Sequence, residues 1–254
     1  MYKGVDEVLE YAHSLGIKIT LATNGLEIVN HLPTIKKCVE IVSISLDGIN
    51  KTHDYFRGVE GAYDCVISML KILHDEGVKT KISSIIWKQN VDQLEDMVVL
   101  AKSLNVMKLN FNILVPVGRA KNNTEILIDT SRYHEVYENV NLLIQKYKDE
   151  TFDIDIKRRH KLTKESVSCP GGETIFHINS HGKVSPCSWI SKIECDDFSL
   201  NWERGNLEEC MTKCKNLNNI LSERANKYSF TGCPALAYIH NGSYLSKDPI
   251  HNKV

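Results

Sequence analysis

The sequence has no long apolar run and no surplus of charge of either sign. Its 254 residues include 31 Lys and Arg against 32 Asp and Glu, a formal net charge of -1. Such a balance provides no bulk field that would attract nucleic acid or an anionic membrane. The apolar run Ile82–Trp87 is far shorter than the about 20 residues needed to span a bilayer, and acidic residues interrupt the start of the chain. We therefore expect a cytoplasmic protein with no nucleic-acid or membrane partner.

A disulfide framework is not expected either, although the chain has 8 cysteines. In a reducing compartment, cysteines are kept as thiols or serve as metal ligands. Most of them crowd the last third of the chain, namely Cys169, Cys187, Cys195, Cys210, Cys214 and Cys233. This bias suggests a metal site. Small thiols buried in a metal-free core are the competing explanation.

A regular alternation of helical and extended patterns fills the chain up to about residue 160. The apolar spacing predicts helices over 5–15, 26–37, 62–76, 91–104 and 132–148. Runs rich in β-branched residues predict strands over 17–22, 39–46, 78–87, 106–114 and 152–156. Strands and helices in strict turn are typical of parallel βα units, so we expect an α/β fold.

The alternation stops near residue 160, and a region rich in Cys, Gly and Asn with few long periodic segments follows. We therefore predict two domains, 1–160 and 161–254. The pattern also begins with a helix that has no strand before it. A parallel sheet without its first units would expose an apolar edge strand, which suggests a missing beginning or a partner at that edge.

Polar residues stand at the C-terminal ends of two predicted strands, as Thr23-Asn24-Gly25 and as Ser45-Leu46-Asp47-Gly48. In parallel βα folds, ligands bind at the C-terminal ends of the strands. Ser and Asp side chains at such an end suit hydrogen bonds to a small polar ligand. The alternative is ordinary turn chemistry, since turns require the same residue types.

Several motifs, in order and spacing, resemble the radical S-adenosylmethionine (radical SAM) enzymes, in particular the subgroup that matures peptides, sulfatases and quinone cofactors. The run Ile41–Gly48, followed by His53-Asp54 and Arg57-Gly58, resembles the fourth barrel strand and its loop. Asn90 and the segment 116–119 match the exits of the next two strands. The resemblance implies a partial (βα)6 TIM-like barrel that lacks its first strands, plus a small cysteine-rich extension.

In that family, a reduced [4Fe–4S] cluster cleaves S-adenosylmethionine, and the 5′-deoxyadenosyl radical abstracts hydrogen from a peptide or protein substrate. The resemblance implies that Asn24, Ser45, Asp47 and Arg57 contact the methionine or ribose of this cofactor. Arg57 would pair with the methionine carboxylate in a charge-assisted contact.

The chain after residue 160 resembles the family's SPASM extension, which carries auxiliary iron–sulfur clusters. The resemblance implies metal ligands at Cys169, Cys187 and Cys233, whereas four other cysteine positions of the pattern hold Ile220, Glu223, Ser229 and His251. A [4Fe–4S] cluster normally needs four thiolates. We therefore expect at most one cluster or one zinc ion, completed by Cys195, Cys210, Cys214 or His251, with a metal-free domain as the alternative.

The defining motif of the radical cluster, Cys-x3-Cys-x2-Cys, is absent from the sequence. Cys210-Met-Thr-Lys-Cys214 imitates its first half, but Leu217 stands at the third position. We therefore expect a fragment of a peptide- or sulfatase-maturase-like enzyme that is inactive alone. A separate polypeptide would supply the missing N-terminal barrel. The alternatives are a non-catalytic pseudoenzyme that binds a peptide or partner protein, and a metal-binding structural module.

Overall fold

The computed structural model describes residues 3–156, 169–193, 197–202, 206–228 and 232–249. The chain forms two compact units, each described by itself below. Unit 1 comprises residues 1–114 and 135–157, and unit 2 comprises residues 115–134 and 158–254. The predicted boundary near residue 160 falls among residues outside the described ranges and stays a prediction.

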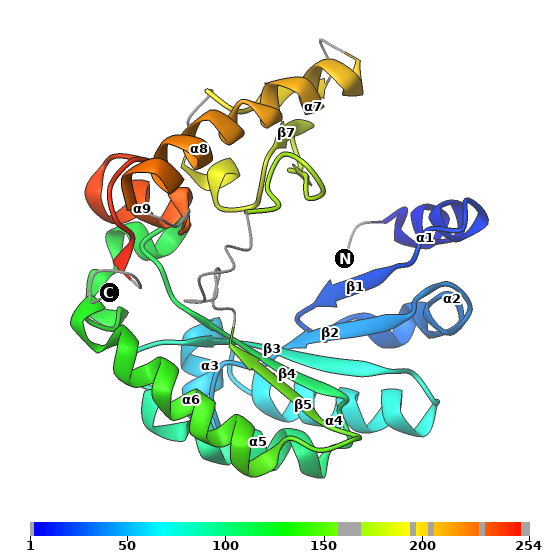
Figure 1. The fold of residues 1–254 in the computed structure, drawn as a ribbon. Coiled ribbons are helices and arrows are strands. Elements are labelled where there is room, and N and C mark those ends of the chain that lie inside the picture. The colour runs from blue at the N-terminus through cyan, green and yellow to red at the C-terminus, as the bar shows by residue number, and fades with distance from the viewer. Residues whose placement is uncertain (1–2, 157–168, 194–196, 203–205, 229–231, 250–254) are drawn as a thin grey trace. The chain divides into compact units, whose positions relative to one another are not determined.

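Unit 1 is built on a five-stranded, wholly parallel sheet with the strand order β1-β2-β3-β4-β5 (Figure 1). This confirms the predicted α/β class, and β1 lies at one edge of the described sheet. The strands are β1 (Thr20–Thr23), β2 (Ile41–Ser45), β3 (Thr80–Ile86), β4 (Lys108–Ile113) and β5 (Asp153–Ile156).

The helices between these strands agree with the apolar spacing, with one addition. They are α1 (Val5–Ser14), α2 (Leu32–Cys38), α3 (Lys51–Arg57), α4 (Ala62–Asp75), α5 (Leu94–Ser103) and α6 (Tyr133–Tyr147). The sequence pattern did not predict α3. It has only 7 residues, and its one buried residue is His53 rather than an apolar stripe.

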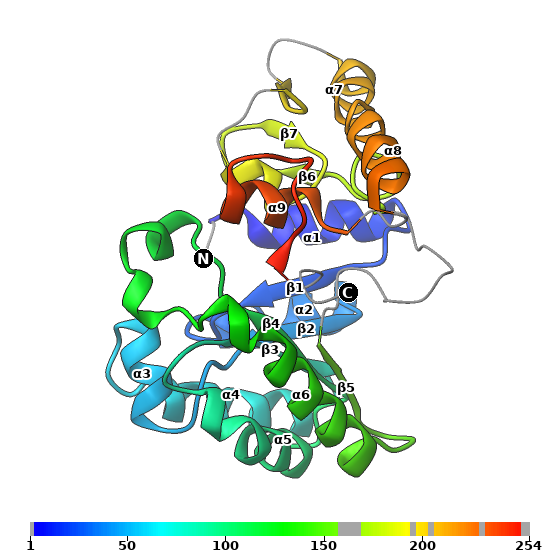
Figure 2. The same ribbon diagram turned by 60° about the vertical axis from the view of Figure 1, so that its left-hand side comes forward.

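The two faces of the sheet differ in chemistry. On one face, Val42, Ile44, Ile82 and Phe111 are completely buried, and helices α4 and α5 pack against β2, β3 and β4 there (Figure 2). The alternate residues point to the opposite face, where β3 and β4 are only half-buried. We call this opposite side the polar face, defined by Ser43, Ser45, Lys81, Ser83, Lys108, Asn110, Asn112, Asp153 and Asp155.

Unit 2 combines a small antiparallel sheet with a group of helices. The sheet has the order β6-β7-β8, from β6 (His177–Ile178), β7 (Lys183–Ser185) and β8 (Leu200–Asn201). The helices are α7 (Leu207–Lys215), α8 (Leu217–Tyr228) and α9 (Pro234–Asn241). The sequence pattern predicted few long elements here, because several inward positions of these helices hold Cys210, Cys214 and Arg224 rather than large apolar residues.

Short 3-10 helices complete the two units, at Ile28–His31, Val91–Gln93, Gly118–Asn122, Thr124–Ile126, Thr130–Arg132 and Ile190–Lys192. Within the described ranges, no helix has both the length and the apolar character needed to cross a bilayer.

Candidate functional site

The side chain of Asp47, two residues after the end of β2, lies at the centre of the candidate site. Its carboxylate is completely buried. One oxygen, Oδ1, accepts a hydrogen bond from the backbone N–H of Ile85 at 2.7 Å, and the other forms an ion pair with Arg57 at the end of α3. Burial raises the pKa of Asp47, while the charge of Arg57 and the Ile85 N–H oppose that shift.

The backbone of Asp47 is held just as closely. Its carbonyl oxygen accepts hydrogen bonds from Trp87 Nε1 and from Asn90 Nδ2, both at 3.0 Å. Its N–H donates to His53 Nδ1 at 3.0 Å. These contacts tie the loop after β2 both to α3 and to the end of β3, so the loop has little freedom to move.

His53 is a neutral acceptor in this arrangement. Its side chain is 1% exposed, and burial together with the nearby charge of Arg57 lowers its pKa to about 4. Because Nδ1 accepts the N–H of Asp47, the ring proton sits on Nε2. His53 therefore fixes the loop without adding a second positive charge beside Arg57.

Of the four predicted cofactor contacts, the structure brings Asp47 and Arg57 together. Ser45 lies on the polar face directly opposite Ser83 of β3. Asn24 is exposed, and its Oδ1 accepts the N–H of Leu26 at 3.2 Å, a contact typical of a turn. The guanidinium of Arg57 is engaged by a carboxylate of its own chain, and its contact with a methionine carboxylate stays a prediction.

Sequence reasoning did not assign roles to Trp87, Asn90 or His53, which hold Asp47 in place. His53 and Asn90 do stand in the motifs of the resemblance, so their positions carried a signal. Trp87 carried none, since a tryptophan at the end of an apolar strand is an ordinary core residue.

The three predicted metal ligands contact one apolar cluster of unit 2. Cys233 is part of this cluster, and Cys169 and Cys187 are partly buried against it. Cys210 and Cys214 belong to a different cluster, with Val184. Burial, together with the nearby thiols of Cys210 and Cys187, raises the pKa of Cys214 to about 11.

Among the described residues, no three His, Cys, Asp or Glu side chains converge as metal ligands. Cys195 and His251, which could complete a site, lie outside the described ranges. The prediction of at most one cluster or zinc ion therefore stays a prediction.

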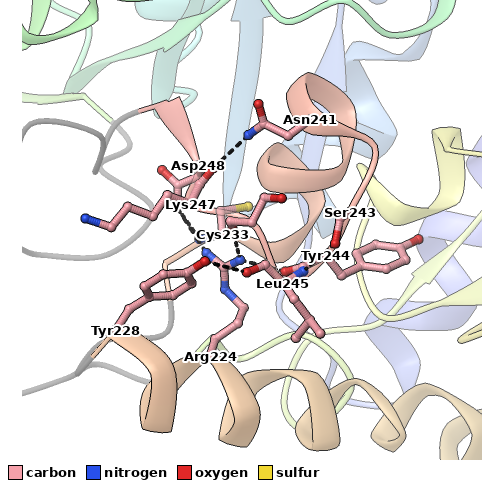
Figure 3. Close-up of polar contacts among 10 residues, drawn as sticks. Arg224, Tyr228, Cys233, Asn241, Ser243, Tyr244, Leu245, Lys247 and Asp248 are labelled. Atoms are coloured by element: carbon pink, nitrogen blue, oxygen red, sulfur yellow. Dashed lines mark hydrogen bonds and ion pairs between the residues drawn. The ribbon is translucent and has the colours of Figure 1, made fainter.

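Two buried charged residues, Arg224 and Asp248, lie near Cys233 (Figure 3). Arg224 is completely buried, and its Nη1 donates to the carbonyl oxygens of Tyr244, at 2.6 Å, and of Ser246. Its Nη2 lies 3.6 Å from Asp248 Oδ2, which also accepts the N–H of Cys233 at 2.9 Å. A cation and a carboxylate thus lie beside Cys233, and its role as a metal ligand stays a prediction.

Part of this chain matches a known protein family. Residues 1–101 match the model of the radical SAM superfamily. The AdoMet-dependent heme synthase of Methanosarcina barkeri is 28% identical over 272 residues, which cover 96% of this chain and 77% of that protein.

Two solved structures share the fold. Histidine-tagged anSMEcpe with bound AdoMet matches with a TM-score of 0.73 at 15% identity, over 98% of this chain and 72% of that chain. SuiB of Streptococcus suis, bound to its precursor peptide SuiA, matches with a TM-score of 0.63 at 18% identity, over 82% of this chain and 50% of that chain. The chain thus spans about half the length of SuiB. Residues 1–101 thus match the radical SAM superfamily, and the chain is similar over 96% of its length to an AdoMet-dependent heme synthase.

Proposed function

We propose that this chain supplies the part of a radical SAM enzyme that contacts S-adenosylmethionine. The arrangement of Asp47 and Arg57 at the C-terminal ends of parallel strands carries the proposal, since ligands of such folds bind there. Among the described residues, Arg57 Nε is buried and has no hydrogen-bond partner. A donor of this kind suits the carboxylate of a methionine, so the residues present fit the cofactor.

When bound, S-adenosylmethionine supplies the 5′-deoxyadenosyl group on which the superfamily's radical chemistry depends. Arg57 would hold its carboxylate, and Ser45 and Asn24 would donate hydrogen bonds to its polar groups. Asp47 would orient Arg57, with His53 and Asn90 keeping the loop fixed. The sequence offers no Cys-x3-Cys-x2-Cys, so the radical cluster does not fit on this chain, and we propose that the chain is inactive alone.

Isothermal titration of S-adenosylmethionine against the whole chain tests this function. Arg57→Met should weaken binding by about tenfold or more, because it removes a charge-assisted contact. Lys51→Gln, at the exposed start of the same helix, should leave binding unchanged. Absence of binding by the wild-type chain, or equal binding by the Arg57→Met variant, would overturn the proposal.

A peptide or protein is the first candidate substrate. The resemblance to the peptide- and sulfatase-maturing subgroup supports it, and SuiB, which shares the fold, is described with a precursor peptide bound. Deuterium transfer from a labelled peptide to 5′-deoxyadenosine, in a mixture with a chain carrying the radical cluster, would test this class.

A tetrapyrrole is the second candidate, and the similarity to a heme synthase over 96% of this chain favours it. The polar face also favours a ligand with hydrogen-bonding and anionic groups over an apolar one. Incubation of the same mixture with an iron porphyrin carrying propionates, followed by mass spectrometry, separates the two classes.

We also propose a polypeptide partner at the open edge of the sheet. Within the described sheet, β1 pairs with β2 alone. The neighbouring helix α1 exposes Val8 and Tyr11, and Leu15 directly after it is exposed as well. Exposed apolar side chains beside an open strand edge are typical of an interface. Light scattering after size-exclusion chromatography should find dimers, aggregates or a complex, and a stable monomer at high concentration would favour the pseudoenzyme alternative.

For the metal-binding alternative, we propose at most one cluster or zinc ion per chain. Elemental analysis of the purified protein should find no more metal than that, and Cys187→Ala should remove whatever is bound. Enough iron for two clusters per chain, or an unchanged metal content in the Cys187→Ala variant, would contradict this proposal.

A further inference from the structure

We propose that Lys81, on the polar face of the parallel sheet, binds a carboxylate of a tetrapyrrole substrate. This inference rests on the proposed function, because it adds a substrate contact to the same unit. It starts from the chemistry of the polar face. Parallel sheets are normally covered on both sides, and their strands are mostly apolar on both faces. A polar face on such a sheet indicates a surface built for a ligand or for water.

The pairing of the strands arranges this face in two rows. In the first row, Ser43 of β2 lies opposite Lys81 of β3, which lies opposite Lys108 of β4, and Asp153 of β5 follows. In the second row, nearer the strand ends that carry Asp47, the same strands contribute Ser45, Ser83, Asn110 and Asp155. Neighbouring strands lie about 4.8 Å apart, and two residues along a strand span about 6.6 Å.

The charges of the first row are unevenly compensated. Lys108 Nζ lies 2.7 Å from Asp153 Oδ2 and 3.9 Å from Asp155 Oδ2, and Lys148 Nζ lies 2.7 Å from Asp153 Oδ1. Both carboxylates of β5 are therefore occupied by other lysines. Lys81 has no ion pair among the described residues, so it is the positive charge that this network leaves uncompensated.

The position of Lys81 is unfavourable for the protein alone. Two like charges directly opposite each other on neighbouring strands are destabilising, and Lys81 is directly opposite Lys108. The half-buried setting of Lys81 limits the water that could screen the two charges. A bound anion would relieve this repulsion, which gives a physical reason for a second lysine at this point.

The neighbours of Lys81 supply hydrogen bonds for the rest of a ligand. Within the described part of the chain, the side chains of Ser43, Ser83 and Asn110 make no hydrogen bond. Ser43 lies directly opposite Lys81 in the first row, and Ser83 and Asn110 lie in the second row. A carboxylate on Lys81 would therefore have hydroxyl and amide groups on the side toward the strand ends. A substrate lying along the strands could place its carboxylate at Lys81 and its reacting part near Asp47.

Tetrapyrroles with propionate groups match these requirements, because they are long enough and carry carboxylates at their rims. The probe is coproporphyrin III, titrated against the whole chain by porphyrin fluorescence, with its tetramethyl ester as the matched ligand without charge. The free acid should bind more tightly than the ester. Lys81→Met should weaken binding of the acid by about tenfold or more and leave the ester unaffected, and Lys81→Arg should restore most of the affinity.

Lys71→Met is the matched control, since Lys71 is exposed on α4, which covers the other face of the sheet. Equal loss in both variants, or no discrimination between acid and ester, would overturn the inference. Binding of an acidic peptide that depends on Lys81, with no porphyrin binding, would overturn the tetrapyrrole assignment.

S-adenosylmethionine binding is measured on the same variants and separates the two proposals. The Lys81→Met variant should bind S-adenosylmethionine like the wild type. If S-adenosylmethionine binds but Lys81→Met does not weaken porphyrin binding, the inference about Lys81 is wrong and the proposed function is unaffected. If S-adenosylmethionine does not bind but porphyrin binding still depends on Lys81, the proposed function is wrong and the carboxylate site at Lys81 is supported.

Discussion

Asp47 and Arg57 form an ion pair in which the carboxylate is completely shielded from water while 30% of the arginine side chain stays exposed. The pair joins the end of β2 to the end of α3. Because one partner has no access to solvent, its charge depends on the other, and the two residues should behave as a unit.

The first prediction concerns Arg57→Met. Removing one partner of a buried ion pair typically costs about 3–5 kcal/mol of stability, because a buried charge is left alone. The pKa of Asp47 is already raised in the folded state, and it should rise further without Arg57. A carboxyl of this kind binds its proton more tightly when folded, so stability is lost as the pH rises from the unfolded toward the folded pKa.

The variant should therefore be more strongly destabilised at pH 7 than at pH 5, as measured by urea unfolding followed by circular dichroism. Asp47→Asn combined with Arg57→Met should recover part of the loss. A loss independent of pH would show that Arg57 acts by packing rather than by charge.

The second prediction concerns His53, whose pKa is lowered from 6.5 to about 4 in the folded chain. Its contribution to stability is complete above pH 6.5 and is lost as the pH falls toward 4, up to about 3 kcal/mol. His53→Asn keeps an acceptor for the Asp47 N–H but cannot titrate. Its unfolding free energy should change less between pH 6.5 and 4 than that of the wild type, and parallel curves would rule out this role.

The third prediction concerns Gly48, in the loop beside Asp47. Its φ is +150°, and an added Cβ would lie 2.6 Å from Thr52 Cγ2 and 2.9 Å from Thr52 Cβ. Gly48→Ala should therefore combine backbone strain with a clash and disturb α3. Gly58→Ala is the control, because Gly58 has a φ of +69° but nothing within 4 Å, so only strain of about 1 kcal/mol is expected. Similar melting temperatures for both variants would argue against the clash.

The fourth prediction concerns unit 2. Arg224→Met removes the cation beside the buried Asp248 and the donor to two carbonyl oxygens, which should destabilise this unit by about 3–5 kcal/mol. Lys227→Met, on the exposed side of the same helix, should have little effect. Added iron or zinc should not restore the Arg224→Met variant, and rescue by metal would instead favour a cluster at Cys233.

Much of unit 1 could be predicted from the sequence, because the spacing of apolar residues records which side of each element is buried. Helix α4 was predicted over 62–76 and spans Ala62–Asp75, and β3 was predicted over 78–87 and spans Thr80–Ile86. Helix α3 was missed because its buried side chain is a histidine. In unit 2, the buried face of α8 includes Arg224, which no apolar pattern detects.

The candidate site could be predicted only in part. The motif resemblance named Asp47 and Arg57 as cofactor contacts, and the two residues do lie together, while the cofactor contact itself stays a prediction. It could not reveal that Arg57 contacts Asp47 itself, since that contact depends on how α3 folds back onto the end of β2. The polar face could not be predicted from the sequence either, because only strand pairing brings Lys81, Asn110 and Asp153 onto the same face of the sheet.

The tryptophan behind Asp47 gives the protein an optical reporter of its own. The indole of Trp87 is completely buried, donates its N–H to the Asp47 carbonyl at 3.0 Å and stacks on Tyr55 at 5.9 Å between ring centroids. Indole emission shifts in wavelength and intensity when the hydrogen bond or the ring contact changes. With Trp189 and Trp202 replaced by phenylalanine, Trp87 would be the one remaining tryptophan. Its emission wavelength would then report ligand binding at the loop in real time, without any added label.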